Sequence, residues 1–106
     1  FEQRVYEWLT SRGYSVIPQF KVGHKRIDLV VEDGKNRLAI ECDGASYHTP
    51  ETWWDDVVRQ RQLERLGWKF CRIWGTAFYS DPESAMMPVI EKLKTLKIFP
   101  KRSNCI

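Results

Sequence analysis

Three acidic residues lie in two short segments that are otherwise largely apolar. Asp28 belongs to residues 26–31, whereas Glu41 and Asp43 belong to residues 37–44. Each acid directly follows an apolar residue, in surroundings where a charge is costly unless it is paired or binds a metal ion. A carboxylate taken alone is most often a solvated surface residue. Three together point to a shared counter-charge, and the simplest one is a divalent cation bound through oxygen ligands.

The two segments show the alternation of apolar and polar residues that is typical of strands. Residues 33–36 connect them and include an Asp-Gly pair, a frequent hairpin turn. If all four connecting residues form the loop, Asp28 lies directly opposite Glu41, with Asp43 on the same face. Opposed strand residues are about 5 Å apart at Cβ, where like charges destabilise. This pairing strengthens the case for a bound cation.

The composition is that of one soluble globular domain. The chain has 106 residues, of which 42% are hydrophobic and 29% charged, enough to bury a single core. The net charge of +3 permits a polyanionic partner without requiring one. The three cysteines include no C-x-x-C pair, which argues against a disulfide framework and a structural zinc site and fits a cytoplasmic location. Because the chain starts at Phe1 and runs directly into a helical pattern, we expect a terminal domain excised from a longer protein.

Helical and strand periodicities follow one another along the chain. Apolar residues repeat at helical spacing in 1–12, 53–66 and 83–97, and alternate in strand fashion in 14–20, 26–31, 37–44 and 68–74. Residues 21–25 and 44–52 read as loops, and Gly13 and Gly67 as helix ends. The predicted order α-β-β-β-α-β-α indicates an α/β fold with a mixed four-stranded sheet flanked by helices.

This order, with Asp28 on the second strand and Glu-x-Asp on the third, resembles the PD-(D/E)XK restriction-endonuclease-like superfamily. Within it, the chain resembles very-short-patch repair endonucleases and the small endonuclease-like domains attached to helicases. The motifs that carry the likeness are Glu-Cys-Asp-Gly at 41–44 followed by His48, and Gly-Trp-x-x-x-Arg at 67–72. The resemblance implies a restriction-endonuclease-like core, with an endonuclease-like domain at 1–98 and a tail at 99–106.

By this resemblance the domain hydrolyses DNA phosphodiester bonds with Mg²⁺, for which Mn²⁺ is a possible substitute. A metal ion neutralises the phosphodiester charge and lowers the pKa of a bound water molecule. The implied catalytic residues are Asp28, Glu41, Asp43, His48 and Glu2, and the implied metal ligands are Asp28, Glu41, Asp43 and Cys42, the last through its carbonyl group.

The sequence departs from the superfamily at Asp43, where most members have a lysine thought to activate the attacking water. His48 matches the active-site histidine of very-short-patch repair endonucleases and can accept a proton near neutral pH. Asp43 is then a third metal ligand, a ligand of a second ion, or a residue that orients His48. The departure keeps two alternatives open: a catalytically inactive nucleic-acid-binding module of the same fold, and a cluster that holds a structural cation.

Several side chains are candidates for DNA contacts. Basic residues flank the acidic strand, and other candidates lie at the hairpin turn and on the central predicted helix: His24, Lys25, Arg26, Lys35, Arg37, Arg59 and Gln60. For Arg59 the alternative is an exposed ion pair with Asp55, four residues earlier on the helix. No groove-reading helix or zinc finger is evident. The expected partners are DNA and a helicase or ATPase domain in the same polypeptide.

Overall fold

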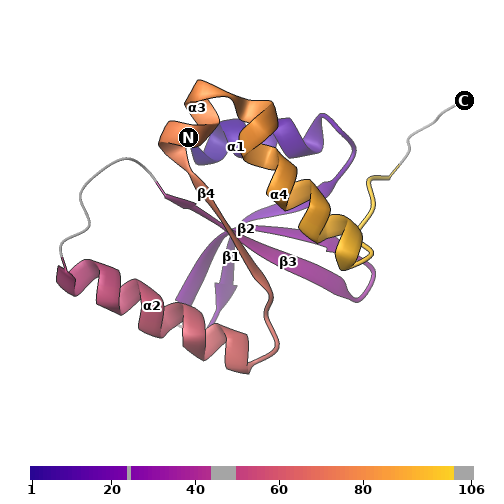
Figure 1. Ribbon diagram of the computed structural model, residues 1–106. Helices are drawn as coiled ribbons and strands as arrows, with labels where there is room; N and C mark the ends of the chain where they lie inside the picture. Colours follow the sequence, from indigo (N-terminus) through magenta and orange to yellow (C-terminus); the bar gives the residue numbers. More distant parts are fainter. Residues whose placement is uncertain (24, 44–49, 102–106) are drawn as a thin grey trace, which may run out of the picture.

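The computed structural model describes residues 1–23, 25–43 and 50–101, and of residues 50–56 only the backbone. It has a single four-stranded sheet among the described residues, in the order β1-β2-β3-β4, with helices on both faces (Figure 1). The strands are β1 (Ser15–Val22), β2 (Lys25–Asp33), β3 (Asn36–Asp43) and β4 (Phe70–Trp74). The helices are α1 (Glu2–Thr10), α2 (Pro50–Arg65), α3 (Gly75–Ser80) and α4 (Pro82–Thr95). The mixed α/β class and the predicted order of elements are confirmed.

The strands pair as a meander followed by a crossover. β1, β2 and β3 are antiparallel neighbours, and β4 lies parallel to β3 after the α2 crossover. In the β2–β3 hairpin Asp33 pairs with Asn36, so Gly34 and Lys35 alone form the turn, with Gly34 at a φ of 62° that glycine adopts without strain. The turn is two residues shorter than expected, but the register is unchanged, and its continuation brings Asp28 opposite Glu41.

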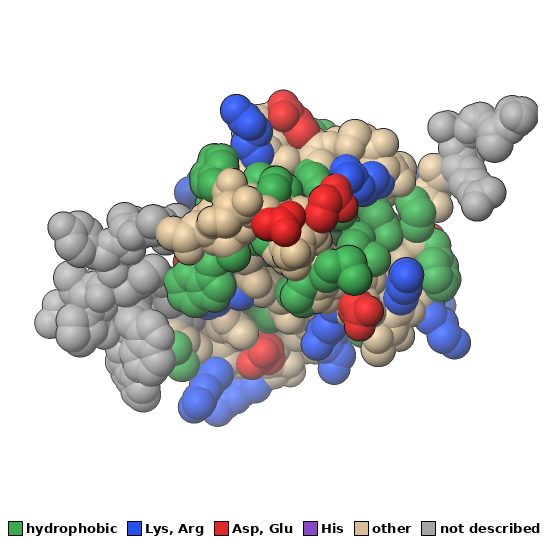
Figure 2. Space-filling model, turned by 45° about the horizontal axis from the view of Figure 1, so that its top comes forward, with side chains coloured by type: hydrophobic (Ala, Val, Ile, Leu, Met, Phe, Trp, Pro, Cys, Tyr) green, Lys and Arg blue, Asp and Glu red, His purple; other side chains and the backbone are tan. Residues whose placement is uncertain are grey.

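One face of the sheet is covered by α1, α3 and α4, which lie together above it in Figure 1. The helices form where the sequence predicts: α1 buries Val5 and Leu9, and α4 starts after Asp81, whose side chain accepts a hydrogen bond from the Ser84 amide at 3.3 Å. Their apolar residues pack on alternate residues of β2, β3 and β4, with Ile98 completing the core. On the outer side of these helices, hydrophobic and charged side chains are interspersed (Figure 2).

The opposite face carries α2 and a smaller apolar cluster. Its described buried members are Ile27, Val30, Ala39, Leu63 and Trp68. Phe20 extends this cluster towards the edge strand β1, with its ring edge-on to Trp68 at 5.5 Å between centroids. None of the described helices is both long and apolar enough to cross a lipid bilayer.

The remaining differences from prediction lie at element ends. β1 runs to Val22 and β2 starts at Lys25, so the expected 21–25 loop is mostly strand. α2 starts at Pro50, within the expected loop, because proline suits the first turn of a helix. Helix α3 was not predicted, since six residues with Phe78 as the one large buried side chain are too short to show a helical repeat.

Candidate active site

Asp28 fills a gap where β2 and β3 separate. The described pairing of these strands stops one residue short of Asp28. The Ala39 amide donates to Lys69 at the β4 side of β3, so the Cys42 amide, an odd number of residues further on, faces the β2 side. That amide donates to Oδ2 of Asp28 at 2.9 Å. The Asp28 carboxylate is thus held between the two strands by the backbone amide of Cys42, which is itself a predicted metal ligand.

Glu41 is the one charged side chain that is buried among the described residues, with 6% of its surface exposed. Its Oε1 accepts a hydrogen bond from Nη2 of Arg59 at 2.7 Å, whereas its Oε2 is buried without a hydrogen-bond partner among the described residues. Burial raises the pKa of Glu41 above its ordinary value, the Arg59 charge opposes the shift, and the Asp28 charge adds to it. A buried carboxylate oxygen without a partner, beside a second carboxylate, is a place where a cation is stabilising.

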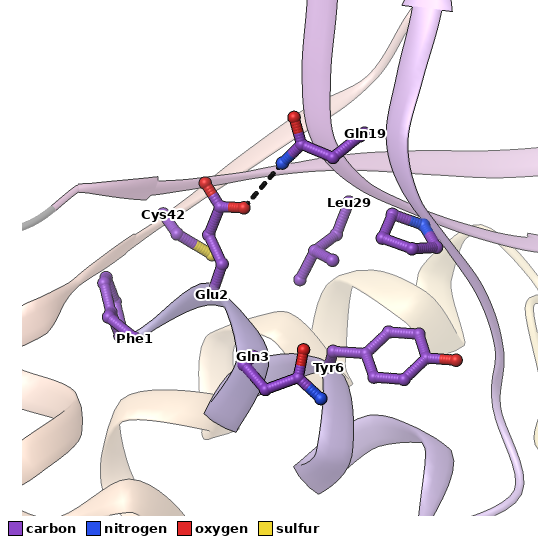
Figure 3. A pocket seen from close by; sticks show the side chains of 8 residues that line it. Phe1, Glu2, Gln3, Tyr6, Gln19, Leu29 and Cys42 are labelled. Atoms are coloured by element: carbon purple, nitrogen blue, oxygen red, sulfur yellow. Dashed lines mark hydrogen bonds between the residues drawn. The ribbon is translucent and has the colours of Figure 1, made fainter.

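Glu2 brings a third carboxyl group to Asp28 from helix α1. Its Oε1 accepts a hydrogen bond from Nε2 of Gln19 at 2.7 Å, across a cavity of about 590 Å³ that α1, β1, β2 and β3 enclose (Figure 3). The pKa of Glu2 is raised by burial, by the negative charge of Asp28 and by a hydrogen bond with the Asp28 carboxyl group. The position of Glu2 beside Asp28 therefore favours the protonated form of the Glu2 carboxyl group.

Gln19 has an unusual backbone for a strand residue. Its φ of 53° lies in the left-handed region, which non-glycine residues seldom adopt. The flanking pairs Pro18–Leu29 and Phe20–Ile27 place Gln19 directly across from Asp28. The distortion therefore lies at the same point where β2 leaves β3, and it aims the Gln19 amide at Glu2.

Asp43 and Arg72 form a separate ion pair on the α2 side of the sheet. The β3–β4 register places Arg72 beside Glu41. Nη1 of Arg72 donates to Oδ2 of Asp43, and its Nη2 donates to Oε1 of Gln60 at 3.1 Å. Arg72 and Arg59 thus supply counter-charges to two of the three acids. The sequence pattern indicates only a divalent cation as a counter-charge and does not predict that arginines pair with Glu41 and Asp43.

The comparison with protein families assigns the chain to a known family. The family model REase_MTES_1575 matches residues 1–93. The chain belongs to this restriction-endonuclease-like family. No curated protein matches the chain. Membership of the family supports a nuclease-type domain, in agreement with the predicted superfamily.

In this family member, the structure places Asp28 near two other predicted catalytic residues, Glu41 and Glu2. Cys42 joins them through its backbone, and burial raises the pKa of its thiol far above the usual range, so the thiol stays protonated. Asp43 is held by Arg72. His24 and His48 lie outside the described residues.

The predicted DNA-contacting residues have mixed positions. Lys25 and Arg26 line a hollow of about 370 Å³ with Lys21 and Gly23. Arg59 contacts Glu41 and also donates from Nη1 to the Arg26 carbonyl at 2.7 Å, and Gln60 accepts from Arg72. The side chain of Asp55, the alternative partner of Arg59, lies outside the described residues.

Sequence reasoning did not assign roles to Arg72 and Gln19. For Arg72 a signal was available, because strand alternation in 68–74 puts it on the face of Trp68 and Phe70, where α2 and Glu41 lie. No sequence signal announces the left-handed backbone of Gln19, since glutamine has no preference for that region.

The residues present suit one hard divalent cation. Among the described residues, no group of three His, Cys, Asp or Glu side chains lies close enough to hold a metal ion. Mg²⁺ keeps several water molecules and takes only one or two protein carboxylates. Asp28 and the unpartnered Oε2 of Glu41 provide that number, and the Cys42 carbonyl is available as a backbone ligand.

Proposed function

We propose that the domain is a Mg²⁺-dependent endonuclease that hydrolyses DNA phosphodiester bonds. The observation that carries this proposal is the convergence of Asp28 and Glu41 at the point where β2 and β3 separate, with the buried Oε2 of Glu41 left unpartnered. Family membership supports a nuclease domain. In this proposal Asp28 and Glu41 bind the ion, which supplies positive charge beside the scissile phosphate and makes a bound water more acidic.

The chain's own side chains then have distinct roles. Arg59 fixes Oε1 of Glu41, and Oε2 is left without a hydrogen-bond partner among the described residues. Glu2, beside Asp28, is the proposed carrier of a proton at the site, because burial and the Asp28 charge raise the pKa of its carboxyl group. His48 is the proposed proton acceptor, by its resemblance to very-short-patch repair endonucleases. Lys25 and Arg26, at the start of the strand that carries Asp28, contact DNA phosphates.

One observation favours an inactive nucleic-acid-binding module as the second candidate. Asp43 stands where most members of the superfamily have a lysine, and its carboxylate is held by Arg72. The positive charge nearest to this position is therefore neutralised by Asp43 itself. In such a module the fold and the basic residues persist and hydrolysis does not occur.

The wider setting follows from the resemblance alone. We propose a cytoplasmic protein in which this domain is joined to a helicase or ATPase domain. The other domain would deliver DNA to the site.

Nicking of supercoiled plasmid tests the enzymatic proposal. The chain is assayed with Mg²⁺, with Mn²⁺ and with EDTA, alongside Asp28→Asn and Glu41→Gln, which preserve side-chain shape. Loss of a metal-binding carboxylate removes several kcal/mol of transition-state stabilisation, so each variant should nick at least about 100-fold more slowly. The exposed acid variant Glu83→Gln is the matched control and should nick normally.

The outcomes separate the candidates. Metal-dependent nicking that both variants lose supports the endonuclease. Nicking that survives both substitutions contradicts the assignment of the site. DNA binding without nicking in either metal supports the inactive module.

A further inference from the structure

A second basic site lies at the far end of the β2–β3 hairpin from Asp28 and Glu41. A hollow of about 190 Å³, here called the basic hollow, is lined by Lys35, Asn36, Arg37, Gly67, Lys69 and Leu96. It contains three cationic side chains and no acidic one. None of these three cations forms an ion pair with a described residue. The hollow is thus an unneutralised concentration of positive charge.

Arg37 is held in this hollow by aromatic rings rather than by a carboxylate. Its guanidinium carbon lies 4.1 Å from the centre of the Trp68 ring and 6.0 Å from that of Phe20. Glu32 is its directly paired residue on β2, yet the two side chains form no ion pair. A guanidinium held over an indole ring has its N–H donors in the guanidinium's own plane, where they remain available to an outside acceptor. The stack therefore presents a fixed fork of donors beside two lysines.

The carboxylates nearest in sequence do not neutralise the hollow. Asp33 accepts a hydrogen bond from the Phe99 amide at 3.2 Å, on the other side of the hairpin turn from Lys35. Glu32 is without an ion pair among the described residues. A planar donor fork flanked by lysines matches the oxygens of a phosphodiester group, whereas an isolated lysine would bind phosphate as a point charge only.

We propose that the basic hollow binds a backbone phosphate of the same DNA that occupies the candidate active site, an inference that rests on the proposed function. Arg37 and Glu41 lie four residues apart on β3, on one face of the strand, so their Cα atoms are about 13 Å apart. At about 3.4 Å per base-pair step, that span corresponds to about four steps of a duplex. A duplex that contacts both sites passes α2, because Ala39 between these two residues is buried in the same cluster as Leu63 of α2. The contact is to backbone, so it anchors DNA without selecting sequence.

The test is the salt dependence of DNA binding by the full chain in EDTA, where no cutting occurs. The probe is a duplex of about 20 base pairs. The double variant Lys35→Gln/Lys69→Gln is compared with Lys92→Gln/Lys101→Gln, which removes the same charge from exposed positions outside the hollow. Arg37→Lys is added, because it keeps the charge and removes the planar fork.

Each lost phosphate contact lowers the slope of log K against log salt by about 0.9. The hollow variant should therefore lose up to about two units of slope and about tenfold or more in affinity, and the control should lose much less. Arg37→Lys should weaken binding while leaving the net charge unchanged. Equal losses of DNA affinity in the hollow variant and the control would overturn the proposal, since both would then report only the general electrostatic attraction between the protein and DNA.

Failure of this inference is distinguishable from failure of the proposed function. Nicking assays report the carboxylate site, whereas the binding assay in EDTA reports the basic hollow. If the native chain nicks plasmid but the hollow variant loses no more DNA affinity than the control, only the proposal for the basic hollow is refuted.

Discussion

The two faces of the sheet are built differently. On the α1–α4 face, thirteen of the described residues form one continuous buried apolar core. On the α2 face the described buried cluster has five members, and charged or amide side chains reach between helix and sheet. There Arg59 contacts Glu41, and Arg72 contacts Asp43 and Gln60.

The contrast separates the residues that stabilise the fold from those that could take part in catalysis. Apolar burial is the main favourable contribution to folding, and it is concentrated where α1 and α4 pack. Burial of Glu41 on the other face works against folding, because it raises the pKa of a carboxyl group that is ionised at neutral pH in the unfolded chain. The face with the thinner core is the one that positions Glu41 and Asp43, whereas Glu2 reaches Asp28 from helix α1 on the other face.

One expected difference between the faces is in packing energy. Leu9 on α1 and Leu63 on α2 are equally buried, at 0% and 1% exposure. Leucine-to-alanine substitutions in cores cost about 2–5 kcal/mol, and less where surroundings can collapse. We expect Leu9→Ala to lower the free energy of unfolding by at least about 1 kcal/mol more than Leu63→Ala does, which is a Tm difference of about 4–8 °C. Equal costs in thermal denaturation would show that α2 packs as tightly as α1 and α4.

Metal binding should stabilise the α2 face selectively. A ligand at about 100 times its Kd adds about 2.7 kcal/mol to the free energy of unfolding. Mg²⁺ or Ca²⁺ should raise the Tm of the native chain, EDTA should reverse the rise, and Glu41→Gln should reduce it strongly. The exposed Glu83→Gln serves as the control. An equal rise in native chain and Glu41→Gln would place the ion elsewhere.

The smallest expected effect is a pH-dependent gain in stability. The pKa of Glu41 is raised in the folded protein, chiefly by burial, so the folded state binds its proton more tightly than the unfolded chain does. Stability from this group is then lost as pH rises above the ordinary value of 4.5 and through the folded pKa. Without metal, Glu41→Gln should have a higher Tm than the native chain at neutral pH, and this advantage should shrink as the pH falls through the folded pKa towards 4.5.

Thermal denaturation across this pH range checks the sign, again with Glu83→Gln as control. A lower Tm for Glu41→Gln at neutral pH would mean that the ion pair with Arg59 outweighs the cost of burying the carboxylate.

The sequence was informative where local patterns carry the signal. Period-two alternation placed Ile40 and Glu41 on opposite faces, and the position of the turn, centred on Gly34 and Lys35, fixed the register that brings Asp28 to Glu41. The same alternation placed Arg72 beside α2, but nothing local indicated that it would pair with Asp43 from the neighbouring strand. Helix α3 was missed because six residues are too few for the spacing of apolar residues to show a helical period.

The sequence by itself determined which strand residues share a face of the sheet and which apolar residues each helix buries. It also determined that the acids of two neighbouring strands share one end of the sheet. Side-chain period and turn chemistry are local properties, so they can be read without coordinates. Only the tertiary structure decided which charges meet: Arg59 with Glu41, Arg72 with Asp43, Glu2 with Asp28, and Arg37 with Trp68. These partners come from segments far apart in the chain, and their choice depends on how the helices cross the sheet.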